Sequence, residues 1–202
     1  MSRRLLVSID YDPDTPESPL EESGFKLYQF NSRRVSYCAR DALPFDDDEL
    51  AELIHKGHAY WLDYFEHGNC LWSLHGGAVQ CRWDTAPCAG LLVLEEPESW
   101  TTDPAQLLKC VRGLLESYTQ WCNGEVYCID ITDEEGNDVD SLGWLIGDDS
   151  VLDALKEMLE PTDDVILLKS DRYDASHLVD KLPCRARHAY GFPVAPLPEY
   201  AI

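Results

Sequence analysis

Residues 59–74 read AYWLDYFEHGNCLWSL, the clearest local structural signal in the chain. Two aromatic-rich runs, 59–66 and 70–74, flank the turn sequence HGN at 67–69, which is the pattern of a β-hairpin. Aromatic side chains are favoured on strands because they pack well on a half-buried, pleated surface. The stretch therefore predicts an antiparallel sheet, and the neighbouring segments are interpreted outward from this hairpin.

Further short strands are expected on both sides of the hairpin. Gly90–Leu94 is a continuous apolar run, typical of a strand that is covered on both faces. Runs 125–132 and 139–146 flank the turn sequence DEEGN at 133–137 and predict a second hairpin. The remaining strands are expected at the start of the chain, within residues 1–10, and at residues 25–30, 34–38, 79–83 and 165–169.

Three segments have the signals of helices. Acids at 46–49 precede an apolar stripe and suit the positive end of a helix dipole, and Gly57 ends this short helix. Residues 103–122 have apolar side chains at steps of three and four behind Asp103-Pro104, and a third stripe begins at Val151. Hairpins with about three packed helices predict an α+β fold.

We expect one α+β domain over residues 1–160. Residues 161–202 are expected to add one strand and a proline-rich, irregular tail that packs on the domain through Tyr190, Phe192 and Tyr200. No segment resembles a signal peptide or approaches the ~20 apolar residues of a membrane span, so a cytoplasmic location is expected.

The charge composition excludes several classes of partner. Among 202 residues, 38 are Asp or Glu and 16 are Lys or Arg, which gives a net charge of −22. Proteins bind the phosphate backbone through Lys and Arg, so direct binding to DNA or RNA is not expected. An anionic membrane surface is disfavoured for the same reason. With 45% hydrophobic residues the chain can still bury a core.

The negative charge is concentrated in two spans. Residues 130–164 contain thirteen acids and one base, Lys156, and residues 10–22 contain six acids and no base, so the two spans supply 18 of the 22 net charges. In the helix after Asp149 the acids recur on one face, opposite the apolar stripe. The predicted partner-binding residues are Asp133, Glu134, Glu135, Asp138, Asp140, Asp148, Asp149, Asp153, Glu157 and Glu160.

Three interpretations of these acids remain open. They can form a solvated surface that aids solubility, bind a basic partner, or hold a cation. DNA also carries closely spaced negative charge, so rows of carboxylates can occupy a basic cleft built for DNA. The segment 133–138 lacks the residue order of a calcium loop and is better explained as a hairpin turn around Gly136-Asn137.

The eight cysteines are expected to be reduced, because several occupy apolar positions and no export signal is found. His67, Cys70, His75 and Cys81 form the one cluster of soft ligands and are a weak candidate zinc site. Cys70 with His67 or His75 is the best pair for a cysteine enzyme. The chain lacks the common catalytic motifs, so we expect no enzyme activity and no cofactor.

Several strings carry a family resemblance: YFEHGNCLWSL at 64–74, CRWD at 81–84, AGLLV at 89–93, YTQWCNGEVY at 118–127 and DVDSLGW at 138–144. Through them, roughly residues 58–155 resemble a family of small acidic proteins of bacteriophages and mobile elements. The resemblance implies such an origin and an accessory role, and it implies no mechanism.

Together these features predict an acidic accessory protein that binds and inhibits a basic host protein. The expected target is a nucleic-acid-binding protein of defence or processing, bound by DNA mimicry, in the host cytoplasm. The alternatives are a metal-dependent or cysteine enzyme centred on residues 67–81, and a structural or assembly protein.

Overall fold

The computed structural model describes residues 3–30, 43–77, 81–100, 103–170 and 172–190. The chain divides into two compact units: unit 1 comprises Met1–Pro16 with Glu125–Ile202, and unit 2 is Glu17–Gly124. Residues 1–160, expected as a single domain, are thus distributed over both units. Each unit has its own hydrophobic core, and the segment after residue 160 supplies part of the first of these cores.

Unit 1 is built on a five-stranded sheet in the order β7-β6-β1-β8-β9. Its strands are β1 (Arg4–Tyr11), β6 (Val126–Asp133), β7 (Asp138–Ile146), β8 (Asp164–Lys169) and β9 (Arg185–Tyr190). β1 runs antiparallel to β6 and parallel to β8, so the first strand lies in the middle of the sheet. The hairpin predicted at 125–146 is confirmed as β6 and β7.

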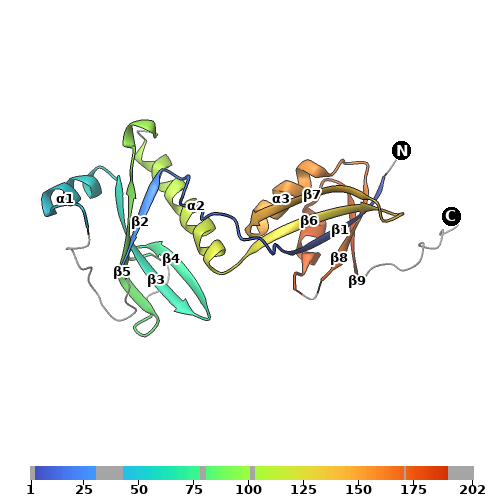
Figure 1. The fold of residues 1–202 in the computed structure, drawn as a ribbon, viewed down its shortest axis with the longest axis horizontal. Coiled ribbons are helices and arrows are strands. Elements are labelled where there is room, and N and C mark those ends of the chain that lie inside the picture. Colours follow the sequence, from blue (N-terminus) through green and yellow to red (C-terminus); the bar gives the residue numbers. More distant parts are fainter. Residues whose placement is uncertain (1–2, 31–42, 78–80, 101–102, 171, 191–202) are drawn as a thin grey trace. The chain divides into compact units, whose positions relative to one another are not determined.

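Helix α3 (Gly147–Met158) and the 3-10 helix η3 (Ala175–Lys181) contribute side chains to the core of unit 1. Alternate residues of β1 such as Val7 pack there with Ile129, Leu155, Leu167 and Leu178, all of which are completely buried. Figure 1 shows α3 lying along the β6–β7 side of this sheet. The alternation of buried and partly exposed residues along β1 follows from the pleat of the strand.

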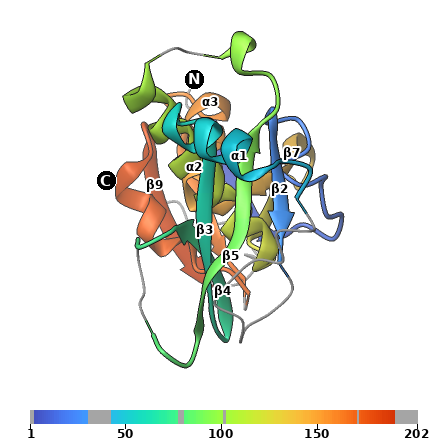
Figure 2. The same cartoon turned by 90° about the vertical axis from the view of Figure 1, so that its left-hand side faces the viewer.

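Unit 2 has a four-stranded antiparallel sheet in the order β2-β5-β3-β4. Its elements are β2 (Phe25–Gln29), α1 (Asp47–His55), β3 (Ala59–His67), β4 (Asn69–Leu74), β5 (Thr85–Leu94), the 3-10 helix η2 (Pro97–Ser99) and α2 (Pro104–Cys122). Figures 1 and 2 show the sheet between the two helices, with β3, β5 and β2 side by side. The hairpin predicted at 59–74 is confirmed as β3 and β4.

The two faces of this sheet bury different residues. Leu62 and Leu92 pack against the apolar stripe of α2, whereas Leu91 and Val93 pack with Leu50 of α1. β5 is thus covered on both faces, as its continuous apolar sequence predicts. The helix starts also follow the sequence: Asp46 forms a capping box with Glu49, and Asp103 caps α2.

Some sequence-based expectations differ from the structure. The tail after β8 is expected to be irregular, but residues 175–190 form η3 and β9, and β9 pairs in parallel with β8 over its whole length. Residues 81–83 are in a turn and are not part of a strand at 79–83. The expected strand at 34–38 and the residues Phe192 and Tyr200 lie outside the described ranges.

Two properties of the whole described chain complete the fold. No helix in the described ranges combines the length and apolar character that a membrane crossing requires. No disulfide joins any two of the seven cysteines in these ranges.

Candidate functional site

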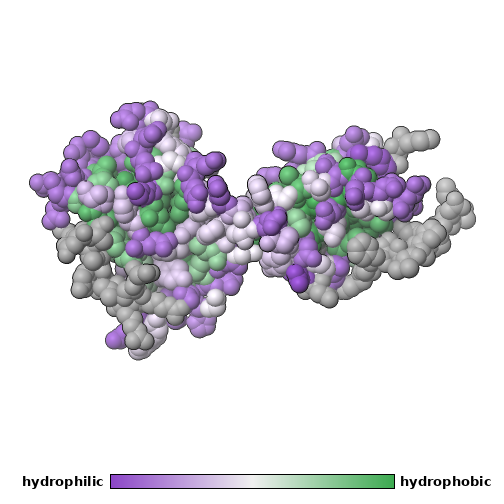
Figure 3. Space-filling view, in the orientation of Figure 1, coloured by the Kyte–Doolittle hydropathy of each residue, from purple (hydrophilic) through white to green (hydrophobic). Residues whose placement is uncertain are grey.

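Strand β7 forms one edge of the unit 1 sheet, and most of it is exposed. Residues 138–144 are all exposed, including the apolar side chains of Val139, Leu142 and Trp144. Trp144 is 64% exposed, and its φ of 62° lies in the left-handed region that a bulky residue rarely adopts. Figure 3 shows hydrophobic residues among hydrophilic ones on this face of unit 1. An exposed, partly apolar edge strand is a surface on which a protein can dock.

All ten acids predicted to bind a partner lie in unit 1, and six of them have side-chain contacts within it, one being Asp140, which accepts the N–H of Ser141. Asp133 accepts hydrogen bonds from Asn137, Glu134 pairs with Arg4, Asp148 with Tyr173 and His177, Asp153 with Lys156, and Glu160 with Arg3. Donation from the side chain and backbone of Asn137 holds the pKa of Asp133 below its usual value. These acids therefore form hydrogen bonds and ion pairs within unit 1 in addition to giving it negative charge.

All of the ten except the half-buried Asp133 are exposed, including Glu135, Asp138, Asp149 and Glu157. Asp149, Asp153 and Glu157 follow one another at steps of four residues, which places their carboxylates on one exposed face of α3. We name these three residues the α3 acidic stripe. Asp149 lies in the first turn, where the helix dipole favours an acid, and Asp153 pairs with Lys156, but like charges at a spacing of four residues repel and cost some helix stability.

The N-terminal acidic span is divided between the two units, because the unit boundary falls after Pro16. Asp12 lies beside β7: its Oδ2 accepts the N–H of Trp144 at 2.8 Å. A Cβ on Gly143 would lie 2.6 Å from the same oxygen, so any larger residue at position 143 would displace the Asp12 carboxylate. Asp12 therefore adds negative charge to the β7 edge and helps to hold Trp144 in place.

Two acids of the span 130–164 serve the fold of unit 1. The buried carboxylate of Asp163 accepts bonds from Arg3 Nε at 3.0 Å and Arg3 Nη2 at 2.7 Å. The hydrogen bond from Arg3 holds the pKa of Asp163 below its usual value in spite of burial. Asp164 pairs with Arg4 and Arg187. The charge that a partner meets is therefore smaller than the sequence count.

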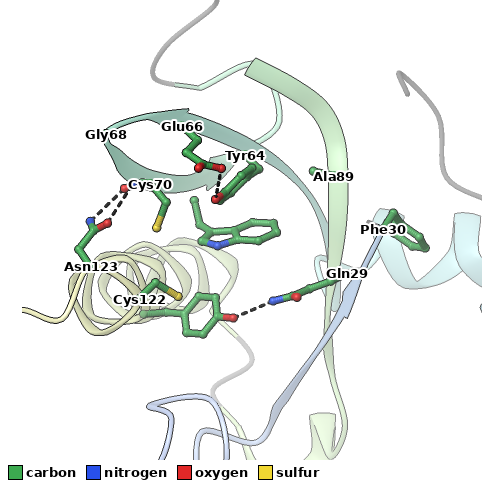
Figure 4. Close-up of a pocket in the computed structure, with 11 residues that line it drawn as sticks. Gln29, Phe30, Tyr64, Glu66, Gly68, Cys70, Ala89, Cys122 and Asn123 are labelled. Carbon is green, nitrogen blue, oxygen red and sulfur yellow. Dashed lines mark hydrogen bonds between the residues drawn. The ribbon is translucent and has the colours of Figure 1, made fainter. Parts of the chain in front are cut away.

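In unit 2, a cavity of about 610 Å³ opens between the end of α2 and the sheet (Figure 4). Aromatic rings of Tyr64, Trp72 and Tyr118 line it, with the Tyr64 and Trp72 ring centroids 4.9 Å apart. Gln29 donates to the Tyr118 hydroxyl at 2.7 Å, and Tyr64 donates to Glu66 at 2.8 Å. Aromatic walls with a few polar groups are typical of sites for small molecules, and the volume lies in their range.

Side chains of α2 and its C-cap bond the outer edge of β4 beside this cavity. The amide of Asn123 both accepts from the N–H of Cys70 at 2.8 Å and donates to the carbonyl of Cys70 at 3.0 Å. The Thr119 hydroxyl accepts the N–H of Trp72 at 3.0 Å. Backbone groups that would otherwise be unpaired are therefore satisfied, which fixes β4 against α2.

Cys70, the thiol proposed for a cysteine enzyme, lies in this cavity next to Cys122 (Figure 4). Burial, together with the neighbouring Cys122, raises the pKa of Cys70 to about 11. Desolvation of the thiol also raises the pKa of Cys122, although the residue as a whole is exposed. Both thiols are therefore protonated at neutral pH, which is the environment of an unreactive cysteine rather than of a nucleophile.

The four residues of the predicted zinc site, His67, Cys70, His75 and Cys81, do not gather at one point. His67 and Cys81 both contact Asp84, at 3.4 Å and 3.3 Å. Cys70 lies in the cavity, whereas His75 contacts a different acid. The four residues are close in sequence, but only His67 and Cys70 lie in the hairpin of β3 and β4, whereas His75 follows β4 and Cys81 precedes β5.

Asp63, His75 and Cys88 do come together, and among the described residues they are the one such group of potential metal ligands. Asp63 lies in β3, His75 directly follows β4, and Cys88 lies in β5. Their ligand atoms all lie within 4.8 Å of one another. Sequence reasoning identified His75 alone; the signal it missed is a lone acid, Asp63, inside an aromatic strand.

Asp63 is the centre of this group and is only 2% exposed. It accepts hydrogen bonds from His75 Nδ1 at 2.7 Å and from the backbone N–H groups of Gly76 and Cys88 at 2.9 Å each. Burial alone would raise the pKa of Asp63, but these hydrogen bonds outweigh it and hold the pKa below its usual value. Burial and the charge of Asp63 raise the pKa of Cys88.

The group does not have the arrangement of a catalytic triad. In a triad the nucleophile and the acid contact different nitrogens of the histidine ring. Here Asp63 Oδ1 and Cys88 Sγ both face Nδ1 of His75, at 2.7 Å and 3.6 Å. His75 therefore cannot pass a proton between them in the way a triad does.

Comparison of the chain with protein-family models, with curated proteins and with solved structures finds no match.

Proposed function

We propose that the protein binds a basic partner protein through unit 1. The contact surface comprises β7, with Val139, Leu142 and Trp144, and the α3 acidic stripe. Trp144 is the observation that carries most weight, because a largely exposed tryptophan on an edge strand costs solubility unless it is used. Tryptophans that become buried when a complex forms are also frequent anchors of protein interfaces.

Charge complementarity defines the chemistry of the partner. Asp138 and Asp140 lie in β7 among its apolar residues, and Asp149 and Glu157 lie in α3, which follows β7 in the chain. All four acids are exposed. Lys156 is the single base between residues 130 and 164, and it already pairs with Asp153. A partner that places Lys or Arg around an apolar pocket for Trp144 would match this surface, and its binding would weaken with salt.

We further propose that the partner is a nucleic-acid-binding protein and that binding inhibits it. The α3 acidic stripe presents a carboxylate about every 6 Å along the helix axis, so it can occupy a cleft that otherwise holds a phosphate backbone. The resemblance of the two hairpins to proteins of phages and mobile elements supports an accessory inhibitor, acting in the host cytoplasm on a defence or processing protein. This role requires no reaction and no cofactor.

A capture experiment with matched variants tests this function. Immobilised full-length protein is exposed to host lysate at low and high salt, and captured proteins are identified and challenged with duplex DNA. The test variants are Trp144→Ala and the stripe variant Asp149→Asn/Asp153→Asn/Glu157→Gln. We expect a basic protein that is released by salt and by DNA, and that neither variant captures.

A control variant removes the same number of charges from exposed positions of unit 2: Asp48→Asn/Glu52→Gln/Glu116→Gln. It should capture the partner as the wild type does. If the stripe variant and Trp144→Ala retain every interaction of the wild type, this surface is not the binding site. Equal losses in the stripe and control variants would indicate attraction by net charge alone.

A further inference from the structure

The strands around Asp63, His75 and Cys88 are distorted where the three side chains meet. Leu62 of β3 is in register with Gly90 of β5, but Tyr64 is in register with Ala86. Asp63 alone therefore faces residues 87–89, so β5 bulges at this point. Bulges of this kind are frequent next to functional sites, because they redirect a side chain.

The bulge places Cys88 in an unfavourable backbone conformation. Its φ is 50°, in the left-handed region that residues other than glycine seldom adopt. This conformation directs the N–H of Cys88 to Asp63 and leaves its Sγ 3.6 Å from His75 Nδ1. The three ligand atoms are therefore contributed by two adjacent strands, β3 and β5, and by the residue that follows β4.

The three donors form a set suited to one kind of ion. A carboxylate oxygen, an imidazole nitrogen and a sulfur are the ligands of Zn²⁺, a borderline-soft cation, whereas Mg²⁺ and Ca²⁺ prefer oxygen alone. Asp63 is held in place by backbone donors from Gly76 and Cys88, which is the second layer of hydrogen bonds that oriented metal ligands require. His75 and Cys88 are partly exposed, so an ion can enter from solvent.

We propose that Asp63, His75 and Cys88 bind one Zn²⁺ ion. Asp63 contributes a carboxylate oxygen, His75 its Nδ1, and Cys88 its thiolate. On binding, the thiol proton of Cys88 is released to solvent, and any proton on His75 Nδ1 is replaced by the ion while Nε2 carries the ring hydrogen. Three protein ligands leave a fourth position for water or an external ligand.

Metal binding by the full-length protein tests the site. Purified protein is dialysed against a chelator, loaded with ZnCl₂ or CoCl₂ alone, and assayed by elemental analysis and by competition with a coloured chelator. We expect one equivalent of zinc, and a cobalt complex with tetrahedral d–d bands and thiolate charge-transfer absorption. Cys88→Ser should abolish the charge-transfer band, and both Cys88→Ser and His75→Gln should weaken zinc binding at least tenfold.

Matched controls are Cys81→Ser and His67→Gln, which alter the same residue types in the same hairpin region. They should bind zinc as the wild type does. The site is disproved if the wild type retains no stoichiometric zinc, if either Cys88→Ser or His75→Gln binds as tightly as the wild type, or if the controls lose binding equally. The cobalt spectrum of the wild type decides the thiolate ligand even if a variant folds poorly. None of these outcomes depends on partner binding by unit 1.

Discussion

The ion pair between Arg3 and Asp163 should contribute substantially to the stability of unit 1. The two residues connect the start of β1 to the turn before β8, and Asp163 also accepts the N–H of Glu160 at 2.8 Å. We consider the substitution Asp163→Asn, which keeps the size of the side chain. It removes the charge and replaces one of the two acceptor oxygens by a donor that faces Arg3.

The magnitude follows from the contacts that are lost. A hydrogen bond to a charged group contributes about 1.5–3 kcal/mol, and two from Arg3 end on Asp163. Arg3 is 44% exposed, so water replaces part of what it loses. We therefore expect the variant to lower the free energy of unfolding of unit 1 by about 2 kcal/mol at neutral pH.

The effect should depend on pH with a defined sign. The pKa of Asp163 is lowered in the folded state, so its contribution is complete above the unfolded value of about 3.9 and is lost as pH falls through the folded pKa. The difference between wild type and variant should therefore shrink as pH falls below the unfolded value of about 3.9 and through the lower folded pKa. Hydrogen exchange followed by mass spectrometry on peptides from β1, β6 and β8 measures unit 1 separately from unit 2.

The control is Asp149→Asn, the same chemical change at an exposed position of the same unit. It should leave exchange in these strands unchanged. Our reasoning is wrong if Asp163→Asn exchanges like the wild type at neutral pH, or if its deficit is the same at low pH.

Three further predictions concern single residues. Thr119→Val should lower the free energy of unfolding by about 1–3 kcal/mol in urea titrations, because the buried N–H of Trp72 loses its acceptor; Thr119→Ser should restore most of it. Trp144→Gly should be more stable than Trp144→Ala by about 1 kcal/mol, because glycine adopts a positive φ without strain; equal stability would show that the position relaxes. Cys70, with its pKa raised to about 11, should be alkylated by iodoacetamide slowly at neutral pH and faster as pH approaches that value. The exposed Cys110 provides the reference rate. Rapid alkylation of Cys70 at neutral pH would contradict its burial.

Local structure was predictable from the sequence because its causes are local. The hairpin of β3 and β4 follows from aromatic runs around a tight turn, and α2 follows from Asp103-Pro104 and an apolar stripe. The exposed acids of α3 follow from their spacing alone. That Asp148 instead bonds Tyr173 was not predictable, because Tyr173 reaches it from a segment with no periodic pattern.

The division into units and the Asp63 group were not predictable, because both depend on pairing between distant strands. Nothing in the sequence of β1 indicates that it lies between β6 and β8. Asp63 and Cys88 meet because β5 bulges opposite β3, and the positive φ of Cys88 has no signature in composition. The zinc ligands predicted from sequence were chosen because they are close in sequence. For this reason, His75 is the one residue that they share with the group of Asp63, His75 and Cys88.

The central position of β1 has a consequence for synthesis on the ribosome. β1 ends at Tyr11, but its antiparallel partner β6 begins only at Val126, and all of unit 2 is made in between. At about 5–20 residues per second this interval is on the order of ten seconds. Unit 2 can complete its folding during that time. Leu5, Val7 and Ile9 of β1 meanwhile remain an unpaired apolar segment, because the strands that pair with β1 have not yet been synthesised. The nascent chain is thus exposed to chaperones and to aggregation at β1, and substitutions in β1 should affect the yield of folded protein more than substitutions in unit 2 of equal thermodynamic cost.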